Sequence, residues 1–99
     1  MIKVVISPDA VLDYDESFSW YSKRSRKSAL EFENEISDAI DRIARDYAAC
    51  PRFDDTYQYT RLNRYPFLAV FRLEDDIAHI VAIAHTIRRQ GFWKARDQT

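Results

Sequence analysis

The chain has 99 residues and a formal net charge of −1, and 46% of its residues are hydrophobic and 31% charged. This length predicts one small domain over residues 1–99 and excludes a second catalytic lobe or a repeat array. No apolar run approaches the ~20 residues of a membrane span, and the single Cys50 excludes a disulfide framework, so we expect a cytoplasmic protein. The balanced charge argues against a free-standing nucleic-acid binder.

Charge is unevenly distributed along the chain. Residues 1–50 carry 7 basic and 10 acidic side chains, whereas residues 51–99 carry 8 basic and 6 acidic ones. Within the second half, the stretch from Arg88 to Arg96 holds four cations and no acidic residue. We therefore expect a local positive patch at the C-terminal end of an acidic body.

The N-terminal segment predicts a strand followed by a helix. Residues 2–6 are mostly β-branched and end at Ser7-Pro8, where Ser7 is suited to cap a helix and Pro8 to its first position. Apolar residues then recur at helical spacing, which predicts an amphipathic helix from Pro8 to about Ser22. The acidic residues of this helix, Asp13 among them, are expected on its solvent face.

A second helix is predicted after a short polar turn over residues 23–27. Ser28 and Glu31 have the spacing of a capping box, and an apolar stripe begins at Ala29 and continues until Pro51 stops the helix. Two helices joined by so short a turn should lie antiparallel, each with its apolar stripe on the same partner.

That partner is a predicted sheet. The segments Tyr57–Arg64, Tyr65–Leu73 and Ile77–His85 are rich in aromatic and branched residues, and the acidic residues 74–76 predict a tight hairpin. A polar tail follows from Thr86. The expected fold class is α+β, with an N-terminal strand, an antiparallel helical hairpin and a three-stranded antiparallel meander (β-α-α-β-β-β), the helices packed on one sheet.

Few residues suggest chemistry, and neither a metal nor a cofactor is expected. His79, His85 and Cys50 lack the spacing of metal ligands. A small basic and aromatic set remains, and if the last three strands are neighbours, its members converge on one edge. Arginine fits phosphate and aromatic rings stack on bases, so a phosphodiester site is one hypothesis. Composition favours the alternative that these arginines are surface charges or pair with acidic residues of a protein partner. The set is Arg61, Arg64, His85, Arg88, Arg89, Phe92, Trp93, Lys94 and Arg96.

Two further aromatic residues predict a protein-binding surface. Trp20 and Tyr47 exceed what a core of this size requires, and excess apolar surface on a small protein marks an interface. For Trp93 two arrangements stay open: either its ring lies on a free, target-binding tip, or it folds back to cover the sheet edge.

Four features occur in a characteristic order. They are an early strand and a helix with Trp20-Tyr21; a second helix with Phe32 that ends at Pro51; the segment Arg61–Phe67; and the ending Ala82–Arg88, followed by Trp93 and Arg96. Together they resemble the RelE/ParE superfamily of bacterial type II toxins over nearly the whole chain. The resemblance implies a growth-inhibiting toxin that a cognate antitoxin, encoded beside it, neutralises.

The resemblance leaves the target and the mechanism open. RelE-like members cut messenger RNA in the ribosome, and that pattern would make Arg61, Arg64 and Arg88 catalytic. ParE-like members instead poison DNA gyrase by binding. Here Leu68 stands where the nuclease has an Arg, and a Leu cannot stabilise phosphate charge. An indole at Trp93 donates a hydrogen bond but cannot exchange a proton as a Tyr could.

We therefore expect a ParE-like toxin; the alternatives are a ribosome-dependent endoribonuclease and a non-toxic antitoxin-binding homologue. The C-terminal residues Arg88, Arg89, Phe92, Trp93, Lys94 and Arg96 are expected to contact the target. Trp20 and Tyr47 are expected to contact the antitoxin.

Overall fold

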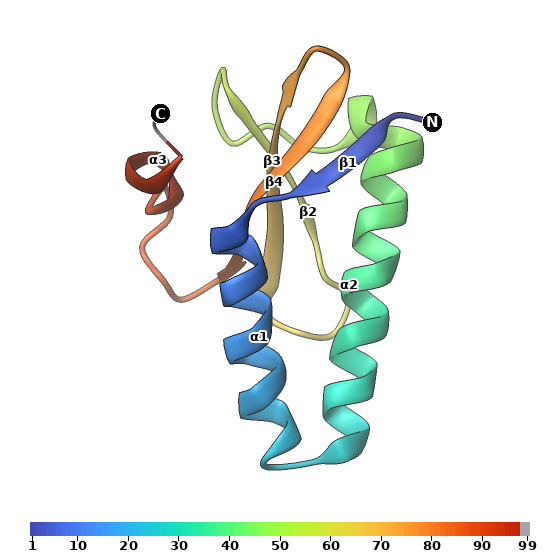
Figure 1. The fold of residues 1–99 in the computed structure, drawn as a ribbon, viewed down its shortest axis with the longest axis vertical. Coiled ribbons are helices and arrows are strands. Elements are labelled where there is room, and N and C mark those ends of the chain that lie inside the picture. Colours follow the sequence, from blue (N-terminus) through green and yellow to red (C-terminus); the bar gives the residue numbers. More distant parts are fainter. Residues whose placement is uncertain (98–99) are drawn as a thin grey trace.

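The computed structural model describes residues 1–97. Its elements are, in chain order, β1 (Lys3–Ile6), α1 (Pro8–Ser22), α2 (Arg26–Asp46), the 3-10 helix η1 (Tyr47–Ala49), β2 (Tyr57–Arg61), β3 (Phe67–Glu74), β4 (Ile77–His85) and α3 (Trp93–Arg96). This order confirms the predicted β-α-α-β-β-β arrangement and the α+β class (Figure 1). The predicted polar tail was incomplete, because it contains α3, a helix too short to show any periodicity.

The four-stranded sheet has the order β1-β4-β3-β2. The last three strands form the predicted antiparallel meander, with Phe67 opposite His85 and Arg61 opposite Leu68. β1 pairs in parallel with β4, Lys3 opposite Ile77, so the sheet is mixed. β4 therefore lies between two strands, which explains its nearly continuous apolar sequence.

The start of α2 differs from the prediction. The N-cap is Ser25, whose hydroxyl accepts the backbone N–H of Ser28 at 3.2 Å, and the helix begins at Arg26. The predicted capping box of Ser28 and Glu31 is wrong because Ser28 already lies inside the first turn. Both serines have a side chain that can cap a helix. The turn after α1 selects Ser25, because its backbone N–H donates to the Tyr21 carbonyl at 2.8 Å and so fixes Ser25 just before α2.

The connections between strands also refine the prediction. Residues 62–66 lie between β2 and β3, so the predicted strands over Arg64 and Tyr65 were too long. The Glu35 carboxylate on α2 accepts the backbone N–H of Arg64 at 2.9 Å, in place of a neighbouring strand. Between β3 and β4 the predicted tight hairpin is confirmed, with Asp75 and Asp76 at φ 52° and 62°, the signature of a two-residue turn of type I′.

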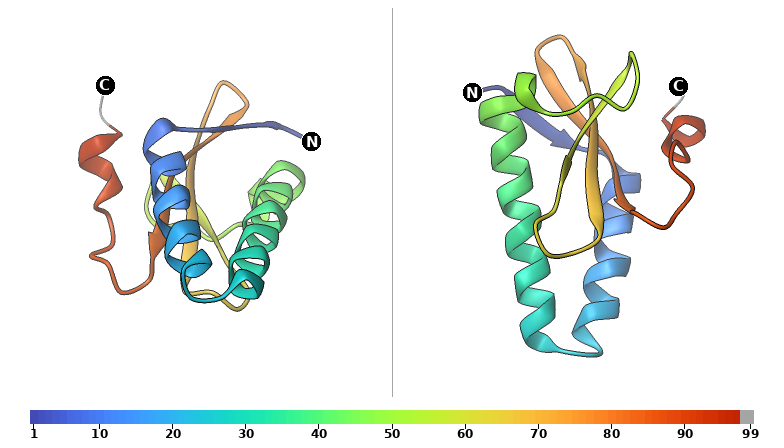
Figure 2. Two further views of the ribbon diagram at one scale, coloured as in Figure 1. Left: turned by 60° about the horizontal axis from the view of Figure 1, so that its bottom comes forward. Right: turned by 180° about the vertical axis from the view of Figure 1, so that it is seen from behind.

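Each face of the sheet carries its own apolar core. The helical hairpin covers one face, where Phe32, Ile43, Phe71 and Ile80 are almost fully buried. The opposite face packs against Trp93 of α3. The views in Figure 1 and Figure 2 agree that α3 and α2 lie on opposite sides of the sheet. Within residues 1–97, no helix is both long and apolar enough to cross a membrane.

Candidate functional site

A pocket of about 410 Å³ lies between α1 and the end of β4. α1 supplies one wall, Phe67 and Ile83 line the interior, and the chain beyond β4 supplies the other wall. The pocket brings together Trp20, expected to bind a partner, and Arg88, expected to act on a target. Its lining residues are Asp13, Glu16, Ser17, Trp20, Tyr21, Phe67, Ile83, His85 and Arg88.

The aromatic wall of this pocket has one exposed ring and one partly buried ring. Trp20 is 51% exposed, and its ring packs edge-on against Tyr21 at a centroid distance of 5.1 Å. The Arg24 guanidinium lies 3.7 Å above the indole, a cation–π contact that orients the ring. Burial raises the pKa of Tyr21, so its phenol stays a neutral donor at physiological pH.

Arg88, the cation that lines the pocket, stacks on Phe92, which does not line it. The Arg88 guanidinium lies 3.6 Å above this ring, and the Arg96 guanidinium lies 5.0 Å from the ring centroid. Arg88 and Arg89 are exposed and form no ion pair within residues 1–97. They are therefore the charges of the C-terminal patch that are free to meet a partner's anions.

The other cations of the predicted patch are already paired with carboxylates. Lys94 Nζ lies 2.7 Å from the Asp54 carboxylate, and Arg96 pairs with Asp13 on α1. These two pairs neutralise half of the predicted positive patch.

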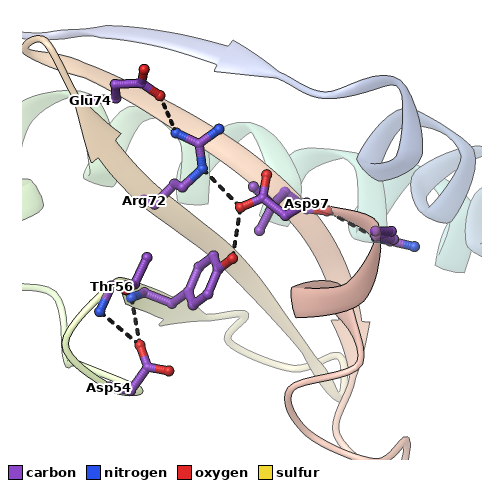
Figure 3. A network of polar contacts seen from close by, with 8 residues as sticks. Asp54, Thr56, Arg72, Glu74 and Asp97 are labelled. Carbon is purple, nitrogen blue, oxygen red and sulfur yellow. Dashed lines mark hydrogen bonds and ion pairs between the residues drawn. The ribbon is translucent and has the colours of Figure 1, made fainter. Parts of the chain in front are cut away.

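A third ionic contact joins α3 to the strands. Asp97 accepts hydrogen bonds from Arg72 Nε at 2.8 Å and from the Tyr57 hydroxyl at 2.7 Å (Figure 3). Arg72 also pairs with Glu74 at 2.6 Å, and hydrogen bonding to Asp97 raises the pKa of Arg72. The end of α3 is thus held to both β2 and β3.

Trp93 is fully buried. Its ring packs edge-on against Phe53 at 4.9 Å, Phe92 at 5.4 Å and Tyr57 at 6.0 Å. Of the two arrangements left open by the sequence, the structure has the one in which this ring folds back on the sheet. In this conformation the indole is not available to a target.

The remaining predicted residues lie elsewhere. Arg61 is exposed at the end of β2, and Arg64 pairs with Glu31 of α2 at 3.1 Å. Neither lines the pocket that holds Arg88. Tyr47, in η1, packs partly buried against the hairpin core, where its carbonyl accepts a hydrogen bond from Gln58 at 3.0 Å.

Sequence reasoning missed Asp13. Expected on a solvent face, its side chain is only 10% exposed and lies at the free edge of β4. Its carboxylate accepts the Ile83 backbone N–H at 2.9 Å as well as pairing with Arg96. No local signal separates Asp13 from neighbouring carboxylates such as Asp15, because both occur in the same acidic stretch of α1.

The pocket and its surroundings present few groups for chemistry within the described residues. No group of three or more potential metal ligands occurs within the described residues. Burial raises the pKa of the Cys50 thiol, which leaves it protonated and unreactive. The pocket offers an apolar floor, one stacked guanidinium and one exposed indole, which are the groups that anchor protein contacts.

Comparisons with known proteins place this fold. The family model described as "ParE toxin of type II toxin-antitoxin system, parDE" matches residues 4–89. A chain of the chromosomal ParDE TA system from P. aeruginosa is similar in fold, with a TM-score of 0.75 and 20% identity over 86% of this chain and 96% of that one.

The YoeB dimer from Staphylococcus aureus is more distant, with a TM-score of 0.51 and 16% identity over 84% of this chain and 94% of that one. At these identities both likenesses concern the fold alone. No curated protein matches the sequence. Because the family model spans most of the chain, from β1 to just beyond β4, this chain belongs to the ParE family of type II toxins.

Proposed function

We propose that this toxin inhibits growth by binding DNA gyrase, that it does not cleave messenger RNA, and that a cognate antitoxin neutralises it. The observation that carries this proposal is the covered sheet face. α3 lies on it, Trp93 is fully buried there, and Leu68 beneath has only 9% of its surface exposed. With α3 in this position, the face has no room for an RNA chain.

The chemistry of the same face supports binding over cleavage. Its buried members include Leu68, Val70 and Val81, which are apolar, and Tyr57, whose hydroxyl is hydrogen-bonded to Asp97. Phosphoryl transfer needs cations aimed at developing charge and groups that exchange protons. Of the three arginines expected in a nuclease, Arg88 lies in the pocket and Arg64 is engaged with α2. Arg61 is exposed at the end of β2, and neither it nor Arg64 lines the pocket that holds Arg88. The three arginines therefore do not line one pocket, as a binding toxin allows.

Within the proposed function, Arg88 and Arg89 are the target-contacting cations. Both are exposed and lie shortly after β4, whose last residue, His85, pairs with Phe67 of β3 and so holds their root in place. Phe92 supports Arg88 from below. Lys94 and Arg96 contribute less to target binding, because each would first have to break its ion pair with Asp54 or Asp13.

The antitoxin is proposed to occupy the hairpin side of the molecule. An apolar groove of about 240 Å³ runs between α1 and α2, lined by residues that include Ile6, Val11, Ile36 and Ile40. Val11 is 42% exposed and Ile6 40%. An amphipathic helix places apolar residues at the spacing such a groove accepts. Trp20, at the pocket beyond the same helix, would extend the contact.

The gyrase proposal is tested with purified components. Relaxed plasmid, ATP and gyrase are incubated with the chain, and supercoiling and covalent gyrase–DNA complexes are measured. We expect inhibition or trapped complexes, and intact messenger RNA on translating ribosomes in a parallel primer-extension assay. Codon-periodic cleavage of ribosome-bound messenger RNA without an effect on gyrase would contradict this proposal and show that the chain is a ribosome-dependent endoribonuclease.

A matched pair of variants tests the target-contacting cations. Arg88→Ala with Arg89→Ala should abolish gyrase inhibition and leave the melting temperature unchanged, because exposed charges contribute little to folding. Arg26→Ala with Lys27→Ala removes the same charge from two exposed positions at the start of α2 and should stay active. Equal activity of the two double variants would mean that Arg88 and Arg89 do not take part in target binding.

A second pair tests the antitoxin groove. Val11→Glu places a charge in the groove, whereas Leu30→Glu changes a residue on α2 that is 44% exposed and does not line it. We expect only Val11→Glu to weaken binding of the antitoxin encoded by the adjacent gene, measured by calorimetry. Unchanged affinity of the Val11→Glu variant for the antitoxin would mean that the antitoxin binds another face.

A further inference from the structure

We propose that residues 91–97, called here the strap, open and close over the sheet face opposite the hairpin, with the Asp13–Arg96 ion pair as the catch. The inference concerns the chain itself and does not depend on which target it binds. It rests on three features: the exposed connection between the strap and β4, the ion pairs that hold the strap, and the two buried donors that have no hydrogen-bond partner.

The connection to β4 is an exposed tether. All four residues from Ile87 to Gln90 are exposed, and Ile87 retains 88% of its accessible surface. The hydrogen bonds around this segment are local, such as Arg88 N–H to the His85 carbonyl at 3.0 Å. Gly91 follows at φ 91°, a backbone conformation that glycine adopts without strain. A short segment beyond such a tether can move without disturbing the strands.

The catch closes a gap in the sheet. β1 pairs with β4 only as far as Ile80, so the next part of that edge has no neighbouring strand. There the Asp13 carboxylate accepts the Ile83 N–H at 2.9 Å, and the Arg96 guanidinium donates to the Val81 carbonyl at 3.0 Å. The two side chains, 83 residues apart in sequence, supply the acceptor and the donor that another strand would supply.

The closed strap leaves two donors unsatisfied. Trp93 Nε1 and Arg96 Nε are buried and have no hydrogen-bond partner within residues 1–97. A buried donor without a partner has lost its hydrogen bonds to water and gained none, so it opposes closure. Native structures rarely retain such groups, and here two occur in one short segment. The closed state is therefore less stable than its ion pairs alone suggest, as expected of a unit that opens locally.

Opening would change the surface in one step. Lys94 and Arg96 would leave their carboxylates, and the apolar residues Tyr57, Val70 and Val81 would become accessible. The cations that the sequence assigns to target binding and the apolar face thus become available together. All three anchors of the strap include ion pairs, and salt weakens the most exposed of them, Lys94–Asp54, more than the other two.

The experiment uses the full chain with Trp20→Phe, which leaves Trp93 as the reporter indole. Acrylamide quenching of Trp93 and amide hydrogen exchange of residues 91–97 are measured with Asp13 intact and with Asp13→Asn. We expect Asp13→Asn to raise the quenching constant on the order of threefold and to speed exchange in the strap, while the amides of β3 and β4 stay protected. Asp15→Asn, an exposed carboxylate on the same helix, is the control and should change neither.

Equal quenching and exchange for Asp13→Asn and Asp15→Asn would overturn the proposal. If Asp13→Asn exposes the amides of β3 and β4 as well, a salt titration of the Trp20→Phe chain decides. Raising NaCl from about 0.1 M to about 1 M shortens the screening length several-fold and should increase Trp93 quenching. Constant quenching across that range would also refute the strap.

Discussion

The two faces of the sheet are covered by different kinds of contact. On the hairpin face, α1 and α2 bring 15 and 21 residues, and Phe32 packs against four aromatic rings of its neighbours. On the opposite face, a helix of 4 residues holds one indole in place with ionic anchors.

The contacts that cover the two faces differ in their sensitivity to salt and pH. Apolar packing along two long helices is largely insensitive to salt and moderate pH, whereas ion pairs and hydrogen-bonded carboxyl and phenol groups respond to both. One sheet therefore has a permanently buried face and a conditionally covered one. The four predictions below test this contrast, from the largest expected effect to the smallest.

Phe32→Ala should have the largest effect. Phe32 is fully buried and packs against rings from α1 and the start of β3, including Tyr21 at 5.3 Å and Phe67 at 5.2 Å. Truncation leaves a cavity that the surrounding rings cannot fill, so we expect a loss of about 3–5 kcal/mol in the free energy of unfolding. Urea unfolding followed by circular dichroism measures it; a loss below about 1 kcal/mol would contradict the assigned core.

Trp93→Ala should cost less despite the larger ring, about 1–3 kcal/mol, because the strap undocks while the sheet stays folded. Removing the unpaired Nε1 offsets part of the loss. The same urea titration is used, with Trp20→Ala as the control because that ring is 51% exposed. A loss equal to that of Phe32→Ala would mean that both faces are parts of one cooperative core.

High pH should release an anchor at Tyr57. Burial first, and then the hydrogen bond to Asp97, raises the pKa of Tyr57 from 10.0 to about 12. A raised pKa in an acid means that the neutral phenol stabilises the fold below pH ~10 and that this stability is lost between pH ~10 and ~12. The stability difference between the unmodified chain and Tyr57→Phe, from urea unfolding, should shrink over that range; a constant difference would contradict the Tyr57–Asp97 contact.

Low pH should produce the smallest effect, at Asp54. The hydrogen bond from Lys94, and then the backbone N–H groups of Tyr57 and Thr56, lower the pKa of Asp54 from 3.8 to about 2. A lowered pKa means that this anchor is intact above pH ~4 and lost as the pH falls toward ~2. In the Trp20→Phe chain, Asp54→Asn should remove a small part of the acid transition in Trp93 emission. Asp55→Asn, at the neighbouring exposed residue, should not; identical curves would rule out the Asp54 anchor.

Much of the fold was predictable because its signals are local. The apolar stripe of α2 follows from a period of 3.6 residues, and β4 follows from a short, nearly continuous apolar run; nearby residues determine both signals. Element boundaries were harder. Ser25 and Ser28 are equally good caps in isolation, and the strands end short of Arg64 because the Glu35 carboxylate takes its backbone N–H.

The candidate site was predictable only in part. Trp20 and Arg88 stand out in the sequence as an aromatic and a cation beyond what the core needs, but their shared pocket depends on how α1 lies beside β4. Asp13 and Asp54 gave no signal, because a carboxylate that pairs with a distant cation looks the same in sequence as one in water.

By itself, the sequence determined the order of the elements, the identity of the two long helices and the basic character of the segment after β4. Each of these depends on residues within a few positions of one another. Only the tertiary structure decided that β1 pairs with β4, that Trp93 covers the far face and that Arg96 meets Asp13. The partners in these contacts are far apart in the sequence, and they are set by chain topology and by burial, which no local pattern encodes.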